Sequence, residues 1–191
     1  MRFSDGSAMR LYRQTVEDFG LYSGLELSQE EHEKLKSAAG KMSAKMRAVR
    51  IVAASSVSER DLRQRLIQKG EDPEHAKTAV QWMSDMQLAD DRKTAEQVVS
   101  RCISKGYGIA RAKQALYEKQ IPKQYWQEVL ADYPDQADAI ISFLKERLHS
   151  GADAREVKRT VDALIRRGHS YSQIRRGLDQ LSLETDEFPE G

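Results

Sequence analysis

The chain has 191 residues, of which 31 are lysine or arginine, 30 are aspartate or glutamate, and one is cysteine. A single thiol closes neither an intrachain disulfide nor a cysteine-based zinc site, so the composition excludes both. No basic and apolar leader opens the sequence, and no apolar run approaches the roughly 18 residues of a membrane span. We therefore expect a soluble, cytoplasmic protein without a membrane partner.

The first 40 residues differ from the rest and are expected to form a small N-terminal α+β appendage. Asp5-Gly6 lies between two short apolar stretches, a pattern typical of a hairpin turn. Ser28 followed by Glu31 is a capping-box pattern and predicts the start of a helix. From residue 41 onward, apolar residues recur at spacings of three and four, so the sequence predicts a mainly α fold.

The predicted helices follow an internal repeat. Lys69, Lys119 and Arg167 each close a helix, with a leucine three residues before each, and they stand 50 and 48 residues apart. Such a period predicts three tandem three-helix repeats in an elongated, curved array, because each short helix needs its neighbours for stability. The expected repeats cover residues 41–90, 91–133 and 134–183, and residues 184–191 form an acidic tail.

Three segments resemble a known family: SERDLRQRLIQKG, LADDRKTAEQVVSRCISKGYGIARAKQALYEKQI and VDALIRRGHSYSQIRRGL. They resemble the RecX regulatory proteins, which modulate the bacterial RecA recombinase. The best match runs from Leu88 to Ile121, with the family's Leu-x-Asp-Asp turn at residues 88–91 and its Lys-Gly-x-Gly run at 105–108. The chain departs from the family at Thr94-Ala95, where an aromatic residue often stands, and at Gln120, where the family has glycine.

The resemblance implies three three-helix repeats, no catalysis and no cofactor. It further implies a monomer that binds in the groove of the RecA–single-stranded DNA filament. There it would limit filament growth or promote disassembly, and so lower strand exchange, ATP hydrolysis and co-protease activity in DNA repair, recombination and the SOS response. Some relatives also bind DNA directly, which makes single- or double-stranded DNA the alternative partner.

The Gly106-Tyr107-Gly108 sequence lies between two basic segments and suggests three interpretations: a phosphate-binding loop, a nucleic-acid contact or a turn between two helices. A phosphate-binding loop requires a preceding strand and a following helix. The preceding segment instead has helical periodicity, and no βαβ pattern is present. We therefore expect Gly106 to end one helix in a left-handed conformation and Gly108 to begin the next.

Basic residues around this turn and in the third repeat are the predicted contacts with a partner protein or DNA. Residues 92–133 hold eight basic and four acidic residues, an excess that residues 58–91 lack. For any single residue, an ordinary solvated helix surface is the better interpretation, whereas the set could follow a phosphate backbone or an acidic filament wall. The set comprises ten basic residues together with Tyr107 of the turn: Arg101, Lys105, Tyr107, Arg111, Lys113, Lys119, Lys123, Arg166, Arg167, Arg175 and Arg176.

Catalytic and metal-binding patterns are weak in this sequence. The four histidines are scattered, and Cys102 and Trp126 lie on apolar stripes and are expected in the core. Asp90-Asp91 is better explained as a turn that caps the next helix than as a magnesium site. We therefore predict no catalytic residue and no metal site. Three hypotheses remain: a RecA regulator, a direct DNA-binding module, and a nucleotide-processing enzyme, the last of which lacks acid, base or metal clusters.

Overall fold

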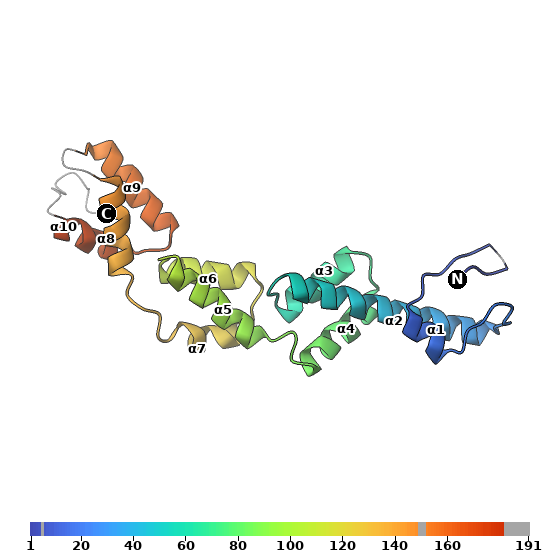
Figure 1. Cartoon of the computed structure of the whole chain (residues 1–191). Coiled ribbons are helices and arrows are strands. Elements are labelled where there is room, and N and C mark those ends of the chain that lie inside the picture. The colour runs from blue at the N-terminus through green and yellow to red at the C-terminus, as the bar shows by residue number, and fades with distance from the viewer. Residues whose placement is uncertain (5, 149–151, 182–191) are drawn as a thin grey trace. The chain divides into compact units, whose positions relative to one another are not determined.

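The structure, a computed structural model, describes residues 1–4, 6–148 and 152–181 (Figure 1). These residues form a mainly helical protein, as predicted. The helices are α1 (Arg13–Asp18), α2 (Gln29–Ala54), α3 (Glu59–Gln68), α4 (Pro73–Asp85), α5 (Asp91–Ser104), α6 (Ile109–Glu118), η1 (Lys123–Tyr125), α7 (Trp126–Leu130), α8 (Ala137–Arg147), α9 (Ala154–Arg166) and α10 (Tyr171–Gln180).

The β part of the expected N-terminal appendage is limited to one isolated antiparallel bridge between Arg2 and Ala8, and the described residues form no strand. Asp5 of the predicted hairpin turn lies outside the described residues, as does the acidic tail at 184–191. Helix α2 runs without a break across residue 40, so the expected start of the first repeat falls inside a helix.

The chain divides into two compact units, Met1–Asp91 and Arg92–Gly191. In the first unit, α2 packs against α3 and α4 around the fully buried side chains of Leu62, Leu66 and Met83. The predicted capping box at Ser28 is confirmed. Gly40 allows the close approach of α4, because a Cβ atom there would lie 2.5 Å from the His75 ring.

Two buried carboxylates fix the turns of the first unit. Glu71 accepts hydrogen bonds from Arg47 Nε at 2.6 Å and Ser43 Oγ at 3.0 Å, which ties α2 to the turn between α3 and α4. Asp91 accepts a hydrogen bond from the Glu59 backbone N–H at 2.9 Å and so caps the start of α3, an interaction that the sequence did not indicate. Burial raises the pKa of the Asp91 carboxyl.

The second unit contains two apolar clusters. One cluster is formed by α5 and α6 with residues that follow them, and Ala95 and Leu116 are its fully buried members. Trp126 is only partly buried against this cluster, and its indole N–H donates to the Ile121 carbonyl at 3.1 Å. The other cluster joins α8, α9 and α10 around Leu144, Leu164 and Ile174. Cys102 is buried, as predicted, and burial raises the pKa of its thiol.

Both glycines of the Gly106-Tyr107-Gly108 sequence have the predicted helix-ending and helix-starting roles. Gly106 has a φ of +63°, and the Tyr107 N–H donates to the Cys102 carbonyl at 3.0 Å, which closes α5 with a left-handed turn. Gly108 is the N-cap residue of α6. The two glycines therefore end one helix and begin the next, as expected for a turn between helices.

The same turn packs backbone against backbone on the α9–α10 turn. The Gly108 N–H donates to the Arg167 carbonyl at 2.9 Å, and a Cβ atom on Gly108 would overlap the carbonyl oxygen of Gly168. His169 is buried, and its Nε2 lies 3.0 Å from the Gly106 carbonyl oxygen. Because a carbonyl only accepts, Nε2 carries the proton, and the buried Nδ1 is left without a hydrogen-bond partner. We refer to these contacts as the glycine junction.

The substitution Gly108→Ala is expected to lower the free energy of unfolding by about 1–3 kcal/mol, because the new methyl group would force the two turns apart. Urea unfolding measures the loss. Gly108 has an ordinary φ of −75°, so the loss there reports the steric contact and not backbone strain. An unfolding midpoint for Gly108→Ala equal to that of the parent chain would contradict the close contact.

Acidic pH is expected to weaken the glycine junction through His169. Burial lowers the pKa of this histidine below its ordinary value, against a smaller opposing effect of its hydrogen bond to Gly106. Between that lowered pKa and the unfolded value of about 6.5, the unfolded chain binds more protons, so stability falls as the pH falls through this window. Urea unfolding between pH 8 and 5 should show this loss, and His169→Gln, which does not titrate, should reduce it. Identical pH profiles would refute the assignment.

Candidate partner-binding surface

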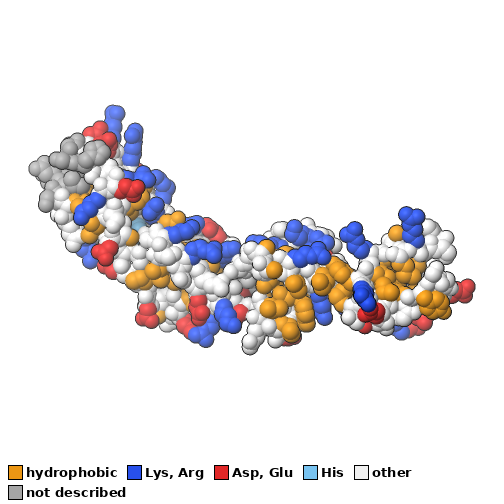
Figure 2. Space-filling model, viewed as in Figure 1, with side chains coloured by type: hydrophobic (Ala, Val, Ile, Leu, Met, Phe, Trp, Pro, Cys, Tyr) orange, Lys and Arg blue, Asp and Glu red, His pale blue; other side chains and the backbone are white. Residues whose placement is uncertain are grey.

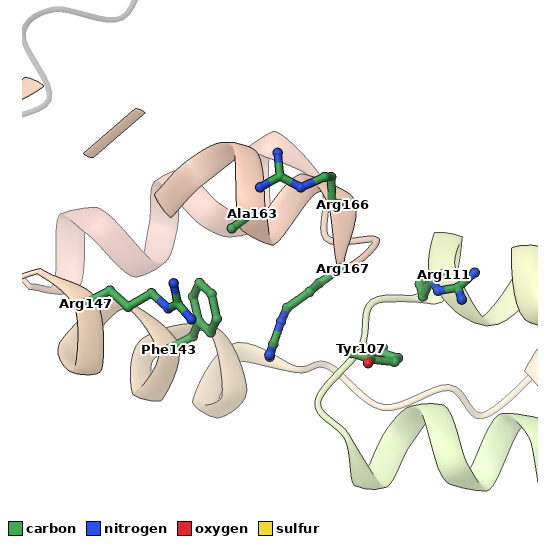
Figure 3. Close-up of a pocket in the computed structure, with 7 residues that line it drawn as sticks. All are labelled: Tyr107, Arg111, Phe143, Arg147, Ala163, Arg166 and Arg167. Carbon is green, nitrogen blue, oxygen red and sulfur yellow. The ribbon is translucent and has the colours of Figure 1, made fainter. Parts of the chain in front are cut away.

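Four of the predicted contact residues meet around one hollow of the second unit. The hollow measures about 350 Å³ and lies between the α5–α6 turn and helices α8 and α9 (Figure 3). Tyr107, Arg111, Arg166 and Arg167 line it, together with Ala163 and two residues that the sequence reasoning did not select, Phe143 and Arg147. We call Arg111, Arg147, Arg166 and Arg167 the arginine cluster.

Aromatic rings position two members of the arginine cluster. The Arg147 guanidinium carbon lies 4.6 Å from the centre of the Phe143 ring, and that of Arg167 lies 4.4 Å from the same centre. Arg167 also lies 5.8 Å from the centre of the Tyr107 ring, and Figure 3 shows it reaching from the end of α9 into the space between the two aromatic residues. These distances are typical of cation–π contacts.

Hydrogen bonding fixes the turn that carries Tyr107. The Tyr133 hydroxyl donates to the Tyr107 carbonyl at 2.7 Å, and burial raises the pKa of Tyr133 to about 12. This hydroxyl therefore stays protonated and keeps donating throughout the neutral range. The glycine junction holds the other end of the turn, so the Tyr107 ring and the start of α6 have defined positions beside α9.

Only one arginine of the cluster pairs with a carboxylate of the described residues. Arg111 Nη1 lies 2.9 Å from Glu118 Oε1 on the same helix. This hydrogen bond raises the pKa of Arg111 and lowers the pKa of Glu118. Arg147 and Arg166 stand in the last turns of α8 and α9, where the carbonyl ends of the helices favour a cation. The cluster therefore keeps an excess of positive charge that an anionic ligand could neutralise.

The remaining predicted residues lie outside this hollow. Arg101 lines a separate hollow on α5 with Glu96, Gln97, Ser100 and Ser104, and Arg176 lines another with residues of α8 and α10. Four further residues are exposed and line none of these three hollows: Lys105, Lys113, Lys123 and Arg175. Lys119 is half-buried. Figure 2 shows lysine and arginine side chains on the visible faces of both units, so basic charge is not confined to the hollow.

A signal for the two missed residues exists in the sequence. Phe143 and Arg147 are four residues apart on one helix, a spacing that brings an aromatic ring and a guanidinium group together. Phe143 also belongs to the apolar stripe of Ile140 and Leu144, and only 6% of its surface is exposed in the structure. The sequence could not indicate that Tyr107 and Arg167 would join them.

Neither a metal-binding group nor a membrane-spanning helix is found in the part of the chain that the structure describes. No three histidine, cysteine, aspartate or glutamate side chains of those residues lie close enough together to hold a metal ion. Their helices are also too short or too polar to cross a bilayer.

Comparison with known proteins identifies the relatives of this chain. No family model matches it. It is 28% identical over 147 residues to the regulatory protein RecX of Halorhodospira halophila, across 75% of this chain and 91% of that protein. It is 25% identical over 142 residues to the regulatory protein RecX of Vibrio parahaemolyticus, across 73% of this chain and 92% of that protein. The resemblance to the RecX regulatory proteins is confirmed.

Crystal structures of RecX proteins share the fold. One, of a regulatory protein RecX, aligns with a TM-score of 0.67 at 19% identity and covers 93% of this chain and 91% of its own. Another, of RecX from Lactobacillus salivarius, aligns with a TM-score of 0.65 at 17% identity and covers 76% of this chain and 98% of its own. The chain thus spans nearly the whole length of these RecX proteins.

Reversing the charge of Arg111 is expected to cost only about 0.5 kcal/mol of stability, because its ion pair with Glu118 is partly exposed and screened by solvent. Lys113→Glu, on the same helix, is the matched control and should leave the unfolding midpoint unchanged. Urea unfolding of Arg111→Glu and Lys113→Glu measures both effects. A loss of several kcal/mol at Arg111 would show that this side chain is part of the folded core and unsuitable as a binding residue.

Proposed function

We propose that this chain is a non-enzymatic regulator of the RecA recombinase. It binds the groove of the RecA–single-stranded DNA filament and lowers recombinase, ATPase and co-protease activity. The observation that carries this proposal is the similarity to proteins named regulatory protein RecX over about nine-tenths of their length. The proposal places the chain in the cytoplasm, in DNA repair, recombination and the SOS response, as a monomer without a cofactor.

The proposed architecture is three three-helix repeats at residues 41–90, 91–133 and 134–183, preceded by the N-terminal appendage and followed by the acidic tail. The aligned leucines support it, because Leu66, Leu116 and Leu164 are all fully buried. The order of the helices also fits a repeat, since α5, α6 and α7 are followed by α8, α9 and α10. Repeated units could contact successive RecA protomers, so that several weak contacts together give a useful affinity.

The arginine cluster is the proposed centre of the contact surface. A guanidinium group can bind a carboxylate or a phosphate through two parallel hydrogen bonds, which suits an acidic filament wall or a DNA backbone. Three of its arginines have no carboxylate partner among the described residues, so binding need not first break an ion pair there. The remaining predicted residues would extend the surface along α5, α6 and α10.

Direct DNA binding is the second candidate function. The same three arginines favour it, together with Tyr107, which is half-buried and lines the hollow. Binding through phosphates would weaken steeply with salt and show little preference for sequence. Tight binding to a duplex in the absence of RecA would favour this candidate over the filament regulator.

Increasing amounts of the chain are expected to slow ATP hydrolysis by RecA on single-stranded DNA and to shorten the filaments seen by electron microscopy. The double substitution Arg147→Glu/Arg166→Glu should weaken this effect by about tenfold in concentration, the equivalent of 1.4 kcal/mol of binding free energy. Its matched control is Lys158→Glu/Arg159→Glu, which reverses two exposed charges of α9 that do not line the hollow.

An unchanged rate of ATP hydrolysis and unchanged filament length with the parent chain would refute the proposed function. Equal inhibition by the parent chain and the Arg147→Glu/Arg166→Glu variant would support the proposed function but show that the arginine cluster is not part of the contact surface. Circular dichroism of each variant shows whether the helical fold is retained.

A further inference from the structure

The arginine cluster holds more positive charge than the described carboxylates around it neutralise. Arg147 and Arg167 both place their guanidinium groups within 4.6 Å of the centre of the buried Phe143 ring. Arg166 lines the same hollow, and Arg111 alone has a carboxylate partner among the described residues. Like charges at such short range repel one another, and an anion placed among them would relieve the repulsion.

The chain itself carries a segment of the complementary charge. The ten residues after Leu181 have the sequence SLETDEFPEG and include the acidic tail at 184–191, which holds four acidic residues and no basic one. They lie outside the described structure. Residues 134–181, by contrast, hold nine basic and seven acidic residues. We propose that this acidic tail binds the arginine cluster of its own chain and competes there with the partner, a competition that rests on the proposed function.

The tether is long enough for this contact. Leu181, the last described residue, packs against the same apolar cluster that contains Phe143. Ten extended residues span about 33 Å, whereas two packed helices are about 20 Å across. A short tether also keeps the tail at a millimolar effective concentration near the cluster. Weak, solvent-screened ion pairs are then sufficient to keep the hollow occupied for much of the time.

The chemistry of the hollow fits a carboxylate peptide better than a nucleic acid strand. Single-stranded DNA is held largely by stacking of its bases on aromatic rings. Only 6% of the Phe143 surface is exposed and two guanidinium groups already lie against its ring, so Tyr107 alone remains for stacking. Arginine forks bind carboxylates in pairs of parallel hydrogen bonds, and an acidic peptide needs no aromatic ring for stacking. The four acidic side chains of the tail are sufficient in number for the three arginines without a described partner.

The test uses the full-length chain and a charge-neutral tail variant, Glu184→Gln/Asp186→Asn/Glu187→Gln/Glu190→Gln. Both are treated with phenylglyoxal at low salt, and modification of each arginine is followed by mass spectrometry of peptides. Arg147 and Arg166 are expected to react about threefold faster in the variant, because the tail no longer covers them. Arg155 and Arg159, which are exposed and line none of the three hollows, are the matched controls and should react equally. In 1 M salt the difference should vanish.

Equal rates at Arg147 and Arg166 in the two chains would overturn the proposal. A difference that grows with protein concentration would assign the contact to the tail of a second copy and would also overturn it. A third outcome would also overturn the proposal: a single-stranded oligonucleotide slows modification of these arginines in the variant, whereas the tail does not slow it in the parent chain. RecA is absent from this assay, so the outcome does not depend on the proposed function.

Competition is tested separately by inhibition of RecA ATP hydrolysis. The charge-neutral tail variant is expected to inhibit at about threefold lower concentration than the parent chain, because its cluster is free. Equal potency would show that the tail does not compete with the partner, even if it covers the arginines. The parent chain could inhibit RecA while Arg147 and Arg166 react with phenylglyoxal at the same rate in the parent chain and the tail variant. That result would support the proposed function and refute the tail contact.

Discussion

The contact on which the second unit depends is the backbone-to-backbone packing of the glycine junction. The Gly108 N–H donates to the Arg167 carbonyl, and neither Gly108 nor Gly168 has room for a Cβ atom. Arg111 follows Gly108 by three residues, and Arg167 directly precedes Gly168, so one contact positions both sides of the hollow. A smaller side chain elsewhere in the core would lower stability through lost packing. A larger residue at this junction would instead push the two turns apart.

Local interactions make the arginine cluster possible at little cost to the fold. The carbonyl ends of α8 and α9 favour the cations in their last turns, the Phe143 ring contacts two guanidinium groups, and Glu118 pairs with Arg111. Each such contact at a partly exposed site is worth about 1 kcal/mol or less. The cluster therefore adds little to stability, and its charges remain available to a ligand.

Short-range patterns in the sequence predicted the helical class and several ends of helices correctly. Ser28 caps α2, Gly106 ends α5 in a left-handed turn, and Cys102 lies in the core. Each of these depends on residues within one helical turn. The weaker inferences concerned longer distances: Trp126, expected in the core, is only partly buried, and helix α2 continues across residue 40, next to the expected start of the first repeat. There the close packing of Gly40 on His75 explains a glycine that otherwise resembles a helix breaker.

The sequence by itself determined the mainly α class, the family resemblance and four of the residues around the hollow, because periodicity, caps and motifs are local properties of the chain. Only the tertiary structure decided that Tyr107 and Arg111 would meet Arg166 and Arg167 from a turn about sixty residues away, and that Phe143 and Arg147 would join them. A glycine in a sequence shows that a backbone can be approached closely. It does not show which backbone will approach, since that choice depends on how the helices on either side bury their apolar faces.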